Sequence, residues 1–505
     1  MAPYFIRNLV PRREKTDRQT PLLEVLRALT WVQWAQFFTG WLAWTCDAID
    51  FFSVSLSVTR LQAAFHKEEA SSITTSITLT LLFRPLGAVI FGILSDRYGR
   101  KWPLVINLGL CGVLQVGTGF VQTFSQFLAV RSLFGIAMGG VWGLAASTAL
   151  ENLPVEARGL ASGVIQQGYA VGYLIAAVVN LQLVPSVKDT WRALFWTAAG
   201  ISFFAAAVRA IVPESAFFLR AKEAERASGK STAHKTKVFI RETKVMLKRH
   251  WLLCIYAVLL MTGFNFLSHG SQDLYPTYLQ VTKGFTSHAA TVATIIGNCG
   301  AVAGGVFAGW ISQYIGRRLT IIIMILWLIC FIPLWILPSK FGPLSAGAFW
   351  LQFGVQGAWG VIPILLAEMS PPAFRATFPG VTYQLGNMVS SASAQIEATA
   401  GNHLKTTVVV NGQTKVVNDY AKVQGILIGV VAAYILVFTI IGPENHGAHF
   451  EKHKAAFEEG GGDDDAFIDG NETKETKERN RDSHGSGSDS RPTSVQLDEK
   501  AADNA

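Results

Sequence analysis

Long apolar runs, separated by short charged loops, dominate the sequence of this chain. Runs such as 103–122, 251–267 and 318–338 approach the ~20 residues that a helix needs to cross a bilayer. The pattern predicts about twelve membrane-spanning helices, at 31–58, 73–95, 102–122, 124–150, 158–184, 191–213, 251–281, 289–312, 318–338, 343–367, 375–400 and 423–442. The predicted fold class is therefore an all-α integral membrane protein whose main surroundings are the lipid bilayer.

Charged residues are few and unevenly placed. Only 15% of the 505 residues are charged, against about 25% in an average soluble domain. Six Lys or Arg precede the first run, ten lie within 220–249, and short basic clusters follow the second and eighth runs. Because cytoplasmic loops are enriched in Lys and Arg, we expect both termini to face the cytoplasm. The net charge of +8 then reflects membrane topology, and no nucleic-acid partner is expected.

The five cysteines lie inside the apolar runs. We expect them to be small buried side chains without disulfides or metals: they are Cys46, Cys111, Cys254, Cys299 and Cys330. The first 30 residues contain no apolar stretch, so the first run is expected to act as the insertion signal.

A basic loop occurs twice in the chain. Gly92-Ile-Leu-Ser-Asp96-Arg-Tyr-Gly99-Arg100-Lys101 recurs 217 positions later as Gly309-Trp-Ile-Ser-Gln313-Tyr-Ile-Gly316-Arg317-Arg318. The same offset relates several further pairs, namely Trp142 and Trp359, Glu151 and Glu368, Arg158 and Arg375, and Gly163 and Gly380. One register held over this length indicates a duplication.

The duplication defines the expected domain organisation. It comprises a cytoplasmic segment 1–30, a first six-helix half 31–213, a cytoplasmic linker 214–250, a second half 251–442 and a tail 443–505. The tail is too polar to bury a core and is expected to be disordered. Its lysines and serines could recruit trafficking or ubiquitination machinery, or the tail could simply be solvated.

The repeated loop resembles the signature of the major facilitator superfamily, and Arg131-Ser-Leu-Phe-Gly135-Ile-Ala-Met-Gly139 resembles that superfamily's fourth-helix motif. The resemblance implies two six-helix halves that alternate access to a central site. Carboxylates and arginines at the loop can form ion pairs or cap a helix terminus, which would hold one access state closed. The gating candidates are Asp96, Arg100, Glu151, Arg158, Arg317, Glu368 and Arg375. In the second copy of the loop, Gln313 stands where the first copy has Asp96, which argues against the same closing contact in both halves. Alternatively, the loops could serve only to fix the membrane topology through their positive charge.

Ionisable side chains inside the apolar runs are costly and usually face a cavity or a partner. They are Asp47, Asp50, Arg84, Arg131, His269, Asp273 and Glu397. The seventh run is the richest, because Asn265, His269, Gln272, Asp273 and Pro276 follow one helical stripe. The proline should free the carbonyl of Gln272 and kink or break the helix. A histidine can exchange a proton near physiological pH, although the His–Asp pair could also serve packing alone.

The stripe has a narrower resemblance. Asn265-Phe-Leu-Ser268-His269-Gly-Ser271-Gln272-Asp273-Leu-Tyr-Pro-Thr277 is similar to the motif Asn-x-x-Ser/Thr-His-x-Ser-Gln-Asp-x-x-x-Thr of the fungal Jen-type lactate/pyruvate:proton symporters. That family implies proton-coupled uptake of short-chain mono- or dicarboxylates across the plasma membrane. It also implies functional roles for Asn265, His269 and Asp273, and for Gln384 and Asn387 in the eleventh run.

Further candidates come from the residues themselves. Arg131 and Arg84 could grip a carboxylate, but the first could be structural and the second could pair with Asp47 or Asp50. Tyr169 could set the volume of the pocket or pack, and Asp50 could join the proton path. Gln384 and Asn387 could instead bond between helices.

The expected function is proton-coupled carboxylate transport without a cofactor. Rival functions are transport of a sugar or an aromatic acid, and a receptor that signals without transporting. The sequence contains no nucleophile elbow, phosphate loop or metal-ligand cluster, so no enzyme is expected.

Overall fold

The computed structural model describes residues 21–188, 191–214, 218–219, 232–410, 413–446 and 460. Three predicted segments therefore lie partly outside the described residues: residues 1–20 of the segment 1–30, part of the linker 214–250, and nearly all of the tail 443–505.

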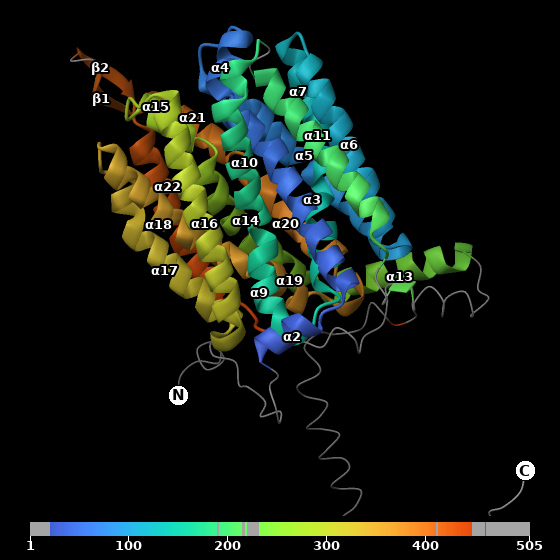
Figure 1. Ribbon diagram of the computed structural model, residues 1–505. Helices are drawn as coiled ribbons and strands as arrows, with labels where there is room; N and C mark the ends of the chain where they lie inside the picture. The colour runs from blue at the N-terminus through green and yellow to red at the C-terminus, as the bar shows by residue number, and fades with distance from the viewer. Residues whose placement is uncertain are drawn as a thin grey trace, which may run out of the picture. The chain divides into compact units, whose positions relative to one another are not determined.

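Helices account for almost all of the described chain (Figure 1). After the short α2 (Leu22–Ala28), the N-terminal half consists of α3 (Trp31–Ser55), α4 (Val58–Ala64), α5 (Ala70–Tyr98), α6 (Lys101–Phe120), α7 (Phe124–Gly139), α8 (Val141–Leu150), α9 (Val155–Gln166), α10 (Gly168–Gln182), the 3-10 turn η1 (Val184–Ser186) and α11 (Trp191–Ile211).

The C-terminal half follows α13 (Thr232–Arg249). It consists of α14 (Trp251–Gln272), α15 (Tyr275–Val281), α16 (Ser287–Ile315), α17 (Arg317–Ile336), α18 (Phe341–Gly360), α19 (Ile362–Met369), the 3-10 turn η2 (Pro372–Phe374), α20 (Thr377–Ser390), α21 (Ser393–His403) and α22 (Tyr420–Ile441). An antiparallel hairpin joins α21 to α22, in which β1 (Lys405–Val410) pairs with β2 (Gln413–Asn418), Lys405 opposite Asn418.

Ten helical segments within the described residues are long and apolar enough to cross a membrane. The predicted spans 31–58 and 375–400 are not among them, for physical reasons that bear on function. Helix α3 carries two buried aspartates, and the eleventh span is divided into two short helices of 14 and 11 residues.

Breaks interrupt several of the spans. The seventh span breaks between Gln272 and Tyr275, as Pro276 predicted. The fourth, fifth, tenth and eleventh spans are also interrupted, at Gly140, Gln167, Val361 and Ser391, and the sequence analysis did not predict these breaks.

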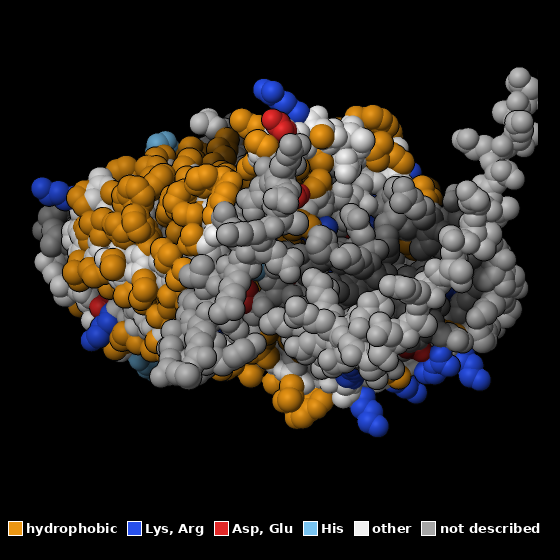
Figure 2. All heavy atoms as spheres, turned by 90° about the horizontal axis from the view of Figure 1, so that it is seen from below, with side chains coloured by type: hydrophobic (Ala, Val, Ile, Leu, Met, Phe, Trp, Pro, Cys, Tyr) orange, Lys and Arg blue, Asp and Glu red, His pale blue; other side chains and the backbone are white. Residues whose placement is uncertain are grey.

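Large apolar side chains cover the outward faces of the helices. Examples on α5, α6, α17 and α22 are Leu86, Ile90, Ile106, Val113, Leu326, Val430 and Val437. Viewed from below, the described surface shows a broad hydrophobic area, with Lys and Arg side chains at its rim (Figure 2). Soluble monomers rarely expose apolar patches of this kind, whereas lipid tails accommodate them.

The cysteines differ partly from expectation. All five are free, but only Cys46 and Cys111 are buried. Cys299 and Cys330 are exposed and Cys254 is partly exposed, because they lie on outward faces of the bundle. The expectation of burial was wrong for these three, since an apolar run does not reveal which face meets lipid.

Two ends of the bundle are distinguished below. The basic end contains the loops 99–101 and 316–318, and the hairpin end contains β1 and β2. The halves touch at both: at the basic end the backbone N–H of Thr377 donates to Asp96 Oδ2 at 3.1 Å, and at the hairpin end Thr74 Oγ1 donates to Gln395 Oε1 at 2.7 Å. Residues midway between the ends are therefore enclosed.

Candidate functional site

The polar stripe of α14 meets α20 in the interior of the bundle. His269 Nδ1 lies 3.0 Å from Asp273 Oδ2, and His269 Nε2 lies 3.0 Å from Asn387 Oδ1. Asn387 in turn donates through Nδ2 to Gln384 Oε1 at 2.7 Å. All four side chains are buried, with at most 2% of the surface of any residue exposed. The structure thus joins the predicted residues of the seventh and eleventh spans into one chain of hydrogen bonds.

The direction of these bonds limits where a proton can reside. Because Asn387 uses its amide N–H toward Gln384, its oxygen faces His269 and accepts a proton held on Nε2. The other ring nitrogen faces a carboxylate, so a second proton can lie on either His269 or Asp273. With that proton present, His269 and Asp273 share a hydrogen bond; without it, two acceptor atoms would face one another.

The break in the helix supplies a bond between the halves. Pro276 has no N–H to offer the carbonyl of Gln272, and that oxygen accepts the hydroxyl of Tyr173 from α10 at 3.3 Å. The side chain of Gln272 donates to Gln352 on α18 at 2.8 Å. Asn265 donates to the carbonyl of Tyr383, the residue directly before Gln384, at 3.2 Å.

Some buried polar atoms at this site have no partner within the described residues. They include Asp273 Oδ1, Gln384 Nε2, Trp44 Nε1 and Trp359 Nε1. An unsatisfied buried polar atom costs about 1–3 kcal/mol. Three of the four are N–H donors, which suits a ligand that carries acceptor oxygens.

Aromatic rings from both halves surround the same region. Trp44 stacks on Tyr169 with ring centroids 5.3 Å apart, and Trp142 stacks on Tyr383 at 4.5 Å. Trp44 also contacts Trp142 and Tyr383 edge-on, so the rings of the two halves form one cluster. Tyr169 is buried within this cluster as a wall residue.

The two membrane arginines have partners in their own half. Arg84 pairs with Asp47 at 3.3 Å, one of the two partners that the sequence left open. Arg131 donates to Gln115 Oε1 at 3.0 Å, and Asp50 accepts from the hydroxyl of Ser202 at 3.1 Å.

The ring of Phe51 lies between Arg84 and His269. The guanidinium of Arg84 lies 5.4 Å from the centroid of Phe51, and the ring of His269 lies 5.5 Å from the same centroid. Sequence reasoning missed Phe51, because an aromatic residue in an apolar run gives no signal of its own.

The gating candidates meet at the basic end. In the N-terminal half, Arg100 contacts Glu151 at 2.8 Å and Asp96 at 3.3 Å. In the C-terminal half, Arg317 donates from two nitrogens to both oxygens of Glu368, at 3.1 and 3.0 Å. The two halves therefore contain equivalent Arg–Glu pairs.

Asp96 and its counterpart Gln313 make different contacts with the opposite half. Asp96 accepts from both the backbone N–H and the hydroxyl of Thr377, the first residue of α20. Gln313 accepts from Arg317 at 3.0 Å and donates to the carbonyl of Val155, at the start of α9, at 3.2 Å. The contact of Asp96 is charged and the contact of Gln313 is neutral, so the two contacts between the halves differ in charge.

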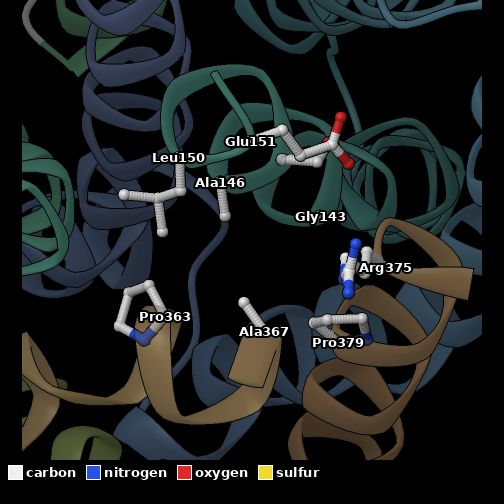
Figure 3. A pocket seen from close by; sticks show the side chains of 9 residues that line it. Gly143, Ala146, Leu150, Glu151, Pro363, Ala367, Arg375 and Pro379 are labelled. Carbon is white, nitrogen blue, oxygen red and sulfur yellow. The ribbon is translucent and has the colours of Figure 1, made fainter. Parts of the chain in front are cut away.

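A small cavity opens beside these contacts (Figure 3). Its lining residues from the two halves are Gly143, Ala146, Ser147, Leu150, Glu151, Pro363, Ala367, Arg375 and Pro379. Glu151 and Arg375 both border it, whereas Arg158 donates to the carbonyl of Leu153 at 2.9 Å. The cavity lies at the basic end, and His269 is not among its lining residues.

The enclosed polar site, the two halves and the repeated basic loops define a multi-pass membrane transporter of the major facilitator fold, and not an enzyme. The fold matches the solved proton:xylose symporter XylE bound to 6-bromo-6-deoxy-D-glucose, with a TM-score of 0.64, 18% identity, and 83% of this chain and 98% of that chain covered. A partially occluded inward open conformation of XylE from E. coli matches with a TM-score of 0.62 and 18% identity, covering 82% of this chain and 99% of that chain.

The chain belongs to the sugar (and other) transporter family, whose model matches residues 22–457. A carboxylic acid transporter protein homolog of Saccharomyces cerevisiae is 37% identical over 432 residues, 83% of this chain and 69% of the relative. This similarity agrees with the resemblance to fungal Jen-type carriers. The cis,cis-muconate transport protein of Acinetobacter baylyi is 26% identical over 70% of this chain and 84% of the relative.

Proposed function

We propose that this transporter moves short-chain carboxylates such as lactate, pyruvate, acetate or a dicarboxylate together with a proton. We place it in the plasma membrane with both termini in the cytoplasm, so that the basic end faces inward and the hairpin end outward. The observation that carries the proposal is the buried chain Asp273–His269–Asn387–Gln384, in which a proton-exchanging pair adjoins an unpartnered amide donor.

The proton has a defined place in this mechanism. Asp273 and His269 share one exchangeable proton, and its uptake neutralises the charge of the pair's carboxylate. A protonated pair next to a bound carboxylate lowers the cost of enclosing the anion, because unpaired charges in a buried site are strongly disfavoured. Binding of the anion and of the proton should therefore favour each other.

The carboxylate has suitable donors close by. Gln384 Nε2 and the indole N–H groups of Trp44 and Trp359 are buried without partners within the described residues. Amide and indole N–H groups donate to carboxylate oxygens. Arg84 and Arg131 do not bind the carboxylate directly in this proposal, since both already have partners in their own half.

Alternating access follows from the contacts between the halves. Release of Asp96 from Thr377 would open the basic end, and separation of Thr74 from Gln395 would open the hairpin end. A monoanion and one proton carry no net charge together. One pH unit corresponds to about 1.4 kcal/mol and supports about tenfold accumulation.

The test is uptake of labelled lactate, pyruvate, acetate and succinate into yeast that lacks its own carriers, with external pH recorded. We expect saturable uptake that alkalinises the medium and that a protonophore abolishes. Absence of saturable uptake would refute carboxylate transport, and uptake indifferent to the protonophore would refute coupling.

Two variants locate the proton site. His269→Ala and Asp273→Asn should abolish accumulation while the protein still reaches the cell surface. His288→Ala is the matched control, because this histidine is exposed at the start of α16. Normal coupled uptake by both site variants would remove the assignment.

A second candidate substrate class follows from the aromatic cluster. Stacked rings favour planar unsaturated or aromatic acids, and the similar bacterial protein is named for cis,cis-muconate. Competition of labelled lactate uptake by muconate and benzoate distinguishes the two. Tight inhibition by the planar acids, with weak lactate uptake, would favour this class.

A further inference from the structure

Glu397 is a buried carboxyl group that the proposed function does not use. It lies on α21, its residue is 0% exposed, and it accepts from Gln424 Nε2 at 2.8 Å and from the hydroxyl of Ser393 at 3.4 Å. Both partners are neutral. Within the described residues, no Lys, Arg or His forms an ion pair with this carboxyl.

Burial without a cation makes the charged form of a carboxyl costly, so a proton on Glu397 stabilises the closed state. The neighbouring amide can serve either form of the acid. As drawn, Gln424 donates to a carboxylate, and its own oxygen Oε1 is buried without a partner within the described residues. Turned over, the amide would present Oε1 to a protonated Oε2–H. The contact therefore persists whether the proton is bound or lost.

The position of Glu397 relates it to the central pair. Along the eleventh span it lies ten positions beyond Asn387, about three helical turns toward the hairpin end. Asp273 lies one turn beyond His269 in the same direction. Helix α14, which carries Asp273, packs against α21, which carries Glu397, and Asp273 Oδ1 has no partner within the described residues.

Few other titratable groups surround Glu397. Helices α22 and α14 both pack against α21, and they carry Tyr420 and Asp273, respectively. At the end of α5, Glu69 is exposed and accepts from Asn402 at 3.5 Å. On β2, Lys415 is exposed to solvent. Glu397 is thus the enclosed carboxyl between the hairpin end and the central pair.

We propose that Glu397 is a second proton-binding site, which takes a proton arriving from the hairpin end and passes it to Asp273 and His269. The transfer moves one proton: the O–H bond at Glu397 breaks, a new bond forms at the Asp273–His269 pair, and Glu397 remains as a carboxylate bonded to Gln424 and Ser393. The inference rests on the proposed proton coupling and adds the route by which the proton reaches the central site.

Glu397→Gln tests this role, because glutamine has the same shape and can still form hydrogen bonds but cannot release a proton. In reconstituted vesicles, exchange of labelled for unlabelled lactate at equal pH should stay within about twofold of wild type. Accumulation driven by a one-unit pH gradient should fall from about tenfold to about onefold. Glu69→Gln, which alters an exposed carboxyl at the same end, should accumulate like wild type.

A second variant guards against misfolding of the first. Gln424→Met removes the amide that bonds the carboxylate, so it should favour the protonated form of Glu397 and shift the pH midpoint of uptake upward by at least half a unit. Unchanged gradient-driven accumulation in Glu397→Gln, or an unshifted midpoint in Gln424→Met, overturns the proposal. If the wild-type protein itself shows no proton-linked uptake, the proposed function fails first, and the inference falls with it.

Discussion

The contact between Asp96 and Thr377 makes a quantitative prediction about the gate. Replacing Asp96 by alanine removes the carboxylate that accepts two bonds at the first turn of α20. Arg100 keeps its partner Glu151 at 2.8 Å, so the loop itself should stay in place. A hydrogen bond to a charged group contributes about 1.5–3 kcal/mol. A loss of about 2 kcal/mol raises the population open at the basic end about thirtyfold.

Cysteine labelling measures that population. Ala146 lines the cavity between the halves at the basic end and is only 8% exposed. In a variant without native cysteines, Ala146→Cys should react with an impermeant maleimide about thirtyfold faster when Asp96→Ala is added, in inside-out vesicles. Right-side-out vesicles should show no such increase.

Gln313→Ala is the matched control for this experiment. It removes the equivalent but neutral bond to Val155, at 3.2 Å, which is worth about 1 kcal/mol. Labelling should therefore rise only about fivefold. Equal rates in the two variants, or no acceleration by Asp96→Ala, would refute the conclusion that a charged contact holds the basic end closed.

Three further predictions concern the same end of the bundle. Glu368→Gln should destabilise the protein by about 3 kcal/mol, because it leaves buried Arg317 without its bidentate partner. Thermal unfolding in detergent measures this loss, and an unchanged melting temperature would contradict it. Gly163→Val should open the basic end, because a Cβ at Gly163 would meet the backbone of α16 at 2.5 Å, whereas Gly200→Val has open space and should behave like wild type in the labelling assay. Burial raises the pKa of Glu444 to about 7, above its ordinary ~4.3. The folded protein thus holds a proton that the unfolded chain releases between these values, so stability should fall as pH rises from about 4.3 to about 7. Melting temperatures from pH 5 to pH 8 should show this slope in the wild type and a flatter one in Glu444→Gln; a slope of the opposite sign in the wild type would count against it.

Much of the fold could be predicted from local properties of the sequence. A span must satisfy its backbone hydrogen bonds within lipid, so length and hydropathy alone located helices such as α5, α6 and α22 to within a few residues. The break before Pro276 followed from a missing N–H, which is a property of one residue. The hairpin carried a weaker signal, since runs of Val and Thr flank Asn411-Gly412 in the sequence, a common hairpin pair.

Pairings between distant residues were decided by the tertiary structure. The sequence offered Arg84 two aspartates at a spacing of one helical turn, and only packing selected Asp47. His269 and Asn387 are separated by 118 positions, and Asp96 and Thr377 by 281. Hydropathy has no information about which faces of two helices meet, because that depends on how the halves are rotated against one another.

The sequence by itself therefore determined the membrane helices, the duplication and the polar stripe that marks the seventh span. The tertiary structure alone decided that this stripe closes onto Gln384 and Asn387, and that Phe51 lies between Arg84 and His269. It also decided that Glu397 is enclosed with no cation paired to it among the described residues. The physical reason is range. Helix formation in lipid is settled within about twenty neighbouring residues, whereas the partners of a buried charge are set by which helices pack together.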